Sequence, residues 1–135
     1  MKSKAPLLLM EQMVMLLVFA LAAAICLRSF VLSDRMSRRG EARDRGVTLA
    51  QTAAETIRHQ GGTPEAALEK AAPSLGGAYE PGLLTVTESQ GDETITLTAR
   101  PEESGISGLS KAALLVEWEG ETVFELTVAW QEVAA

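Results

Sequence analysis

The chain has 135 residues and a mass of 14.4 kDa, which suits one domain of ordinary size and excludes a large enzyme fold. A single cysteine, Cys26, excludes an internal disulfide, and with a single histidine, His59, it excludes a Cys/His zinc cluster. Residues 1–60 carry nine Lys/Arg and five Asp/Glu, a net charge of +4, whereas residues 61–135 carry three Lys/Arg and thirteen Asp/Glu, a net charge of −10. The strongly acidic second part would repel phosphate groups, which argues against a nucleic-acid partner.

A short basic leader, residues 1–6, precedes a predicted transmembrane helix at residues 7–27. Only Glu11 and Gln12 are polar among these 21 residues. As an α-helix the segment would extend about 30 Å, which is the thickness of one hydrocarbon core. We therefore expect a single crossing of the cytoplasmic membrane.

Glu11 is the most informative residue of this helix. An ionised carboxylate costs several kcal/mol in hydrocarbon, so we expect Glu11 to be protonated, paired with a cation or able to reach water. Its place near the start of the apolar run, about 6 to 8 Å from the end, permits snorkelling to the interface. On charge energetics alone, snorkelling and a role in pairing subunits have equal weight.

A cleavable secretory signal is a competing interpretation of the same segment. The basic start, the apolar run and the small residues Ala22-Ala23-Ala24 fit such a signal, and cleavage there would give a mature N-terminus near Ile25. The carboxylate of Glu11 inside the apolar region counts against it, as does the lack of a polar stretch before the alanines.

The helix is predicted to continue outside the membrane over residues 28–60. No proline interrupts it before His59, and Gly61-Gly62 is typical of a helix end, so the helix should end near Gln60. Gly40 and Gly46 lower its stability and suggest a bend. The expected core-facing residues are Ala50, Ala53, Ala54 and Ile57, and those expected to face water are Gln51, Glu55 and Arg58.

Residues 61–135 predict a short helix followed by a sheet. Thr63-Pro64-Glu65 is typical of a helix start, residues 66–72 form the helix, Pro73 stops it, and residues 74–82 form a loop. Four strands follow with alternating apolar residues: Leu84 and Val86; Ile95, Leu97 and Ala99; Leu114, Val116 and Trp118; Phe124, Leu126, Val128 and Trp130. Turns at residues 90–92 and 119–121 join neighbouring strands as hairpins. The predicted fold is therefore α+β, a four-stranded antiparallel β-meander whose apolar face packs on the long helix.

The run LLLMEQMVMLLVFALAAAICL resembles the opening helix of type IV pilins and pseudopilins, and the order of leader, long helix and sheet is similar to theirs. The matching residues are Leu9, Glu11, Met13, Val14, Leu17, Phe19, Ala22 and Ala23. The resemblance implies a minor pilin or pseudopilin that assembles with like subunits through this helix, in a type IV pilus, type II secretion or DNA-uptake machine. The assembly residues it implies are Leu7, Glu11, Met13, Val14, Phe19, Ala22 and Ala23, and Ala20, Ala22, Ala23 and Ala24 would allow close helix approach.

The leader departs from the family pattern. If Glu11 aligns with the family glutamate, Leu7 occupies the mature start, where Phe or Met is usual, and Pro6 stands where prepilin peptidase requires Gly. The pattern therefore argues against cleavage between Pro6 and Leu7. In the family that glutamate is thought to neutralise a neighbour's terminal amine. In an uncleaved chain Lys4 would be the substitute, unless Glu11 reaches the interface.

Arginines next to the membrane indicate contact with anionic lipid head groups, and those expected to make it are Arg28, Arg35, Arg38 and Arg39. Together with Arg43 and Arg45 they outnumber Lys2 and Lys4, so the positive-inside rule favours a cytoplasmic sheet domain, whereas the resemblance implies an extracytoplasmic one. We follow the resemblance. The alternative is a bitopic membrane-anchored adaptor whose acidic sheet domain recruits a partner.

No catalytic constellation emerges from the sequence. His59 lies near a helix end, where a capping or surface role is expected, and Cys26 is a small packing residue. The carboxylate pairs Asp92-Glu93 and Glu102-Glu103 fall in predicted turns, where solvation explains them. Gly76-Gly77 lacks the Lys and Ser/Thr of a phosphate loop. We therefore expect no enzyme activity, no cofactor, no metal and no small-molecule substrate.

Overall fold

The structure is a computed structural model that describes residues 4–132, so Lys2 of the predicted leader lies outside the described residues. The chain divides into two units, Met1–Arg38 and Arg39–Ala135, and one helix, α1 (Ala5–Gln60), contributes to both. Helix α1 begins inside the predicted leader because Pro6 is tolerated in a first turn, where backbone N–H groups have no intrahelical acceptor. Its predicted end at Gln60 is confirmed.

Helix α1 remains α-helical through both glycines at which the sequence suggested a bend. Gly46 is buried, and a Cβ atom built on it would lie 2.9 Å from Val116 Cγ1. This glycine therefore allows the helix and the sheet to approach each other closely. Gly40 has open space around it, since nothing lies within 4 Å of the same constructed atom.

Helix α2 (Pro64–Leu75) starts as predicted but ends later. The hydroxyl of Thr63 accepts a hydrogen bond from the Ala66 N–H at 3.4 Å, and Pro64 occupies the first turn. The prediction that Pro73 stops the helix is wrong. Pro73 forfeits only its own N–H bond in the last turn, and its carbonyl still accepts from Gly76, which ends the helix with a φ of 63°.

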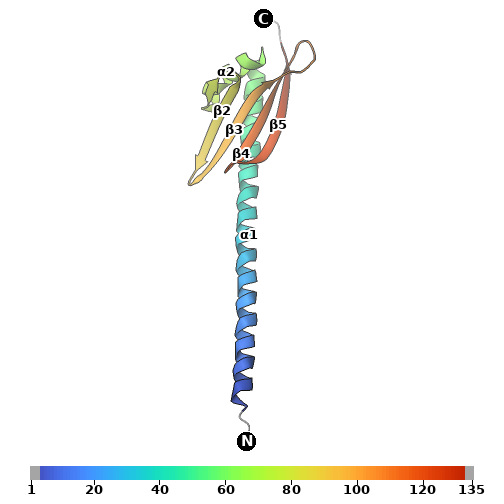
Figure 1. The fold of residues 1–135 in the computed structure, drawn as a ribbon. Helices are drawn as coiled ribbons and strands as arrows, with labels where there is room; N and C mark the ends of the chain where they lie inside the picture. Colours follow the sequence, from blue (N-terminus) through green and yellow to red (C-terminus); the bar gives the residue numbers. More distant parts are fainter. Residues whose placement is uncertain (1–3, 133–135) are drawn as a thin grey trace. The chain divides into compact units, whose positions relative to one another are not determined.

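The sheet has five antiparallel strands in chain order, not the predicted four, and Figure 1 shows β2 to β5 alongside the final part of α1. The strands are β1 (Ala78–Glu80), β2 (Leu83–Gln90), β3 (Glu93–Glu102), β4 (Leu109–Trp118) and β5 (Glu121–Gln131). The additional strand, β1, lies within the predicted loop and pairs with the start of β2. Its three residues between glycine and proline are too short for a periodic signal. The predicted hairpin turns after β2 and β4 are confirmed.

The core of the second unit lies between one face of the sheet and the two helices. The predicted apolar residues of β2, β3 and β4 are buried, as are Ala50, Ala53, Ala54 and Ile57 of α1. Ala42 and Gly46 extend this buried stripe of small residues toward the start of the unit. On β5 only Trp130 is fully buried, while Phe124, Leu126 and Val128 are half-buried. Gln51, Glu55 and Arg58 are exposed, as predicted.

Candidate functional site

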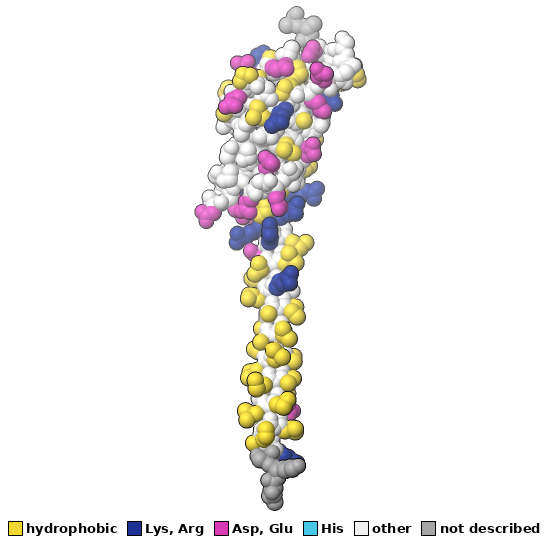
Figure 2. Space-filling view, viewed as in Figure 1, with side chains coloured by type: hydrophobic (Ala, Val, Ile, Leu, Met, Phe, Trp, Pro, Cys, Tyr) yellow, Lys and Arg dark blue, Asp and Glu magenta, His cyan; other side chains and the backbone are white. Residues whose placement is uncertain are grey.

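The first unit exposes an apolar helix. Every described residue from 4 to 38 is exposed, although the most apolar 18-residue window of α1 has a mean hydropathy of 2.5. The side chains of Leu7 and Phe19 are 72% and 73% exposed, and Figure 2 shows hydrophobic side chains along this part of the helix. Helix α1 is thus long and apolar enough to cross a membrane once.

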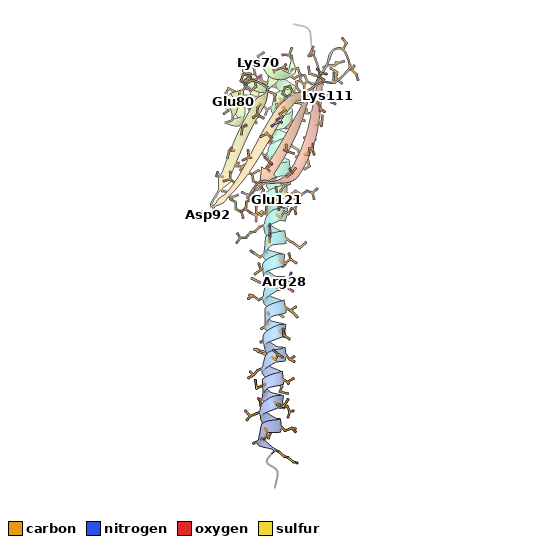
Figure 3. All side chains as sticks on the ribbon, viewed as in Figure 1. Arg28, Lys70, Glu80, Asp92, Lys111 and Glu121 are labelled. Carbon is orange, nitrogen blue, oxygen red and sulfur yellow. The ribbon has the colours of Figure 1, made fainter. Side chains whose placement is uncertain are left out.

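The exposed apolar surface continues beyond the predicted membrane boundary at residue 27. Phe30, Val31, Leu32 and Met36 are each more than half exposed. Arg28 interrupts this surface, and its side chain extends from the helix in Figure 3. A long arginine side chain can keep its charge in the head-group region while its methylene groups lie beside lipid.

The predicted assembly residues do not share one face of the helix. At 3.6 residues per turn, Leu7, Val14 and Ala22 lie on the same side as Glu11. The remaining predicted residues lie elsewhere: Phe19 and Ala23 point to the flank, and Met13, Ala20 and Ala24 point to the opposite side. The helix therefore places Ala22 on the same side as Glu11, and Ala20 and Ala24 on the opposite side.

The carboxylate of Glu11 is exposed and makes no ion pair with another described residue of the chain. Lys4, the predicted substitute for a terminal amine, lies seven residues earlier on the same side, about 10 Å away along the axis. A cation to pair with Glu11 would therefore come from outside the chain, from a lipid head group or a neighbouring helix, whereas water at an interface would solvate the carboxylate.

The predicted lipid-contacting arginines of the first unit are exposed. Arg38 Nε lies 3.2 Å from Asp34 Oδ2 one turn earlier, with both side chains more than half exposed. Such a surface pair contributes at most about 1 kcal/mol. Arg28 and Arg35 are exposed on the same helix.

Two arginines in the second unit bind the sheet instead. Arg45 donates to Gln90 Oε1 at 2.6 Å and to Glu93 Oε2 at 3.1 Å, at the β2–β3 hairpin, and its side chain is only 20% exposed. Arg39 Nη1 lies 3.9 Å from Glu121 Oε2, at the β4–β5 hairpin, where Figure 3 labels Glu121. Arg39, which the sequence predicts to contact lipid head groups, therefore also lies near an exposed carboxylate of the sheet, that of Glu121. The contact of Arg45 with Gln90 joins residues that are 45 positions apart, and no sequence pattern predicts it.

A second anchoring point lies at the other end of the sheet. Trp130 Nε1 donates to the Gly62 carbonyl at 2.9 Å, and Ser110 Oγ lies 3.2 Å from that oxygen and 2.6 Å from Glu132 Oε1. These contacts hold the segment between α1 and α2 against β4 and β5. The strand pattern predicts only that Trp130 is a core residue, because the partner of its indole N–H lies 68 residues away in the sequence.

A surface groove of about 460 Å³ lies beside this anchor and is lined by four glutamates, Glu65, Glu102, Glu103 and Glu132. Lys111 Nζ lies 3.7 Å from Glu102 Oε2. Among the described residues, no group of three or more His, Cys, Asp or Glu is arranged to hold a metal ion. His59 and Cys26 are both exposed and lie on different units.

No protein-family model matches the chain, and neither a curated protein nor a solved structure is similar enough to it to count as a match. The chemistry of the site therefore rests on the exposed helix, its carboxylate and the charged residues beside it.

Proposed function

We propose that the protein is a pilin-like subunit, of the minor pilin or pseudopilin type, held in the cytoplasmic membrane by the first half of α1. It assembles with like subunits through that helix into a filament or a secretion or DNA-uptake machine. The observation that supports this most directly is the exposure of all described residues from 4 to 38. Apolar side chains on every side of one helix need lipid or other helices around them.

The arrangement of side chains on α1 also favours assembly over simple anchoring. A plain anchor requires only hydropathy, whereas this helix carries a carboxylate on one side and the small residues Ala20 and Ala24, one turn apart, on the other. Small residues four apart allow helix backbones to approach closely. A carboxylate in a subunit interface restricts which register the neighbouring helix adopts, provided that the neighbour supplies a cation.

The experiment that tests this proposal compares Glu11→Ala with Gln12→Ala in the full chain, expressed in its own cells. Gln12 is adjacent and polar but lies about 100° away around the helix. We expect Glu11→Ala to reduce co-purification with other pilin-like subunits by about tenfold, equivalent to about 1.4 kcal/mol. Gln12→Ala should leave co-purification and membrane insertion unchanged. Normal co-purification of Glu11→Ala would show that the carboxylate only reaches the interface.

The alternative function, a bitopic adaptor with a cytoplasmic sheet domain, is favoured by one observation. Arg28, Arg35 and Arg38 are exposed beside the apolar run, and the positive-inside rule would place them in the cytoplasm. Protease added to intact cells distinguishes the two functions. Digestion of residues 39–135 supports the extracytoplasmic orientation of the pilin-like subunit, and protection supports the adaptor.

A further inference from the structure

Strand β5 forms a long open edge of the sheet. It has 11 residues and pairs with β4 on one side, and no described strand lies on its other side, as Figure 1 shows. The opposite edge is formed by the three residues of β1 and, beyond its pairing, by residues 86–90 of β2. An edge strand presents unpaired backbone N–H and C=O groups, which are the groups that another extended chain uses to add to a sheet.

The core-facing side chains of β5 are accessible beside this edge. Leu126 and Phe124 are half-buried, whereas their cross-strand partners on β4, Leu114 and Val116, are 0% exposed. The helices therefore cover β4 fully and β5 only in part. With Val128, these residues form a row of apolar side chains at two-residue intervals.

The charged side chains of β5 itself are acidic, and the nearest cations are Lys111 of β4, opposite Ala129, and Arg39, 3.9 Å from Glu121. Strand β5 contains no Lys or Arg, and Glu125 on its outward face is exposed. Residues 61–135 have a formal charge of −10, so pairing this edge with the same edge of a second copy would bring two acidic sheets together. A partner with positive charge is electrostatically complementary, and complementary charge both speeds association and excludes wrong partners.

We propose that the β5 edge binds an extended segment of another protein in which apolar residues alternate with Lys or Arg. The segment adds to the sheet as a sixth strand. Its apolar side chains cover Phe124, Leu126 and Val128, and its basic side chains lie on the face that carries Glu125. This inference is independent of the function of α1, because every residue that it uses lies on the sheet.

The test uses the full chain in nanodiscs of zwitterionic lipid, which do not attract a basic peptide. The probe is a ten-residue peptide of alternating Val and Lys with blocked ends, and binding is measured by calorimetry at two salt concentrations. We expect binding that weakens with added salt. A peptide with Glu in place of Lys should bind at least about tenfold more weakly. A peptide with N-methyl groups on alternate amides should lose a similar factor, because it cannot complete the ladder.

Two variants and one control locate the site. Leu126→Lys and Glu125→Lys each place a positive charge on β5 and should weaken binding of the basic peptide about tenfold. Ile106→Lys makes the same charge change as Leu126→Lys at an exposed apolar residue, 64% accessible, in the β3–β4 connection, and should leave binding unchanged. Circular dichroism confirms that each variant is folded, and Glu125→Lys changes only an exposed side chain.

Three results would overturn the proposal. The first is no binding of the basic peptide at millimolar concentration. The second is equal binding of the N-methylated peptide, which would show attraction without strand addition. The third is concentration-dependent self-association that Leu126→Lys abolishes, which would assign the edge to a second copy.

Discussion

Gly46 of α1 lies directly against Val116 of β4, where a Cβ atom would come within 2.9 Å of Val116 Cγ1. The helix and sheet are thus close enough that this position has no room for a side chain. Gly46→Ala should lower the free energy of unfolding of residues 39–135 by about 1–3 kcal/mol, because a β-branched neighbour such as Val116 cannot move aside freely. Denaturant unfolding of the full chain in detergent measures the change.

Gly40 provides the matched control on the same helix. Nothing lies within 4 Å of a Cβ atom built there, so Gly40→Ala should raise helix stability by up to about 1 kcal/mol. Equal effects of Gly40→Ala and Gly46→Ala would contradict the assignment of Gly46 as a point of close approach.

Arg45 should stabilise the second unit through the β2–β3 hairpin. Its guanidinium bonds Gln90 and Glu93, and its side chain is 20% exposed, so Arg45→Ala should cost about 1–2 kcal/mol of unfolding free energy. Arg43→Ala, at an exposed position two residues earlier, should change it by less than about 0.5 kcal/mol. A double-mutant cycle with Glu93→Gln measures the coupling, and additive effects would show that the ion pair contributes nothing.

The Gly62 carbonyl should be a second stabilising point, because the indole N–H of Trp130 bonds it at 2.9 Å. Trp130→Phe keeps an aromatic ring in the core but leaves this acceptor to Ser110, so we expect a loss of about 1 kcal/mol. Ser110→Ala combined with Trp130→Phe should cost more than the sum of the single variants, since the half-buried Gly62 carbonyl then loses both neighbours. Thermal unfolding of the three variants checks this prediction, and strict additivity would contradict it.

The second unit should fold without the apolar helix. All of its buried core residues lie between Ala42 and Trp130, and none comes from residues 4–38. A chain that starts at Arg39 should therefore be soluble and monomeric, with the circular dichroism of a helix and sheet domain. The full chain should instead require detergent for extraction. Aggregation of the shortened chain, or extraction of the full chain by salt alone, would contradict this division.

Periodicity allowed much of the fold to be predicted. Short-range sequence patterns predict the apolar positions of β2 to β4, the turns at Gly91 and Gly120, and the end of α1. Strand β1 was missed because three residues carry no period, and Pro73 was over-interpreted because one lost hydrogen bond in a last turn is tolerated.

The candidate site was predictable only in part. The apolar segment and the carboxylate of Glu11 are visible in the sequence because a membrane imposes a length and a composition. The contacts of Arg45 with Glu93 and of Trp130 with Gly62 were not, since they join residues 48 and 68 positions apart. The partial burial of the core-facing residues of β5 depends on how far across the sheet the helices reach. The sequence of one strand does not contain that information.

Photo-crosslinking from the first half of α1 asks whether this helix binds other subunits within the membrane. A photoreactive amino acid at Val14, on the side of Glu11, is activated in intact cells, and the adducts are separated by mass. We expect adducts with the corresponding helix of another subunit, and their loss when Glu11→Ala is introduced. Adducts with lipid alone, unchanged by Glu11→Ala, would contradict it.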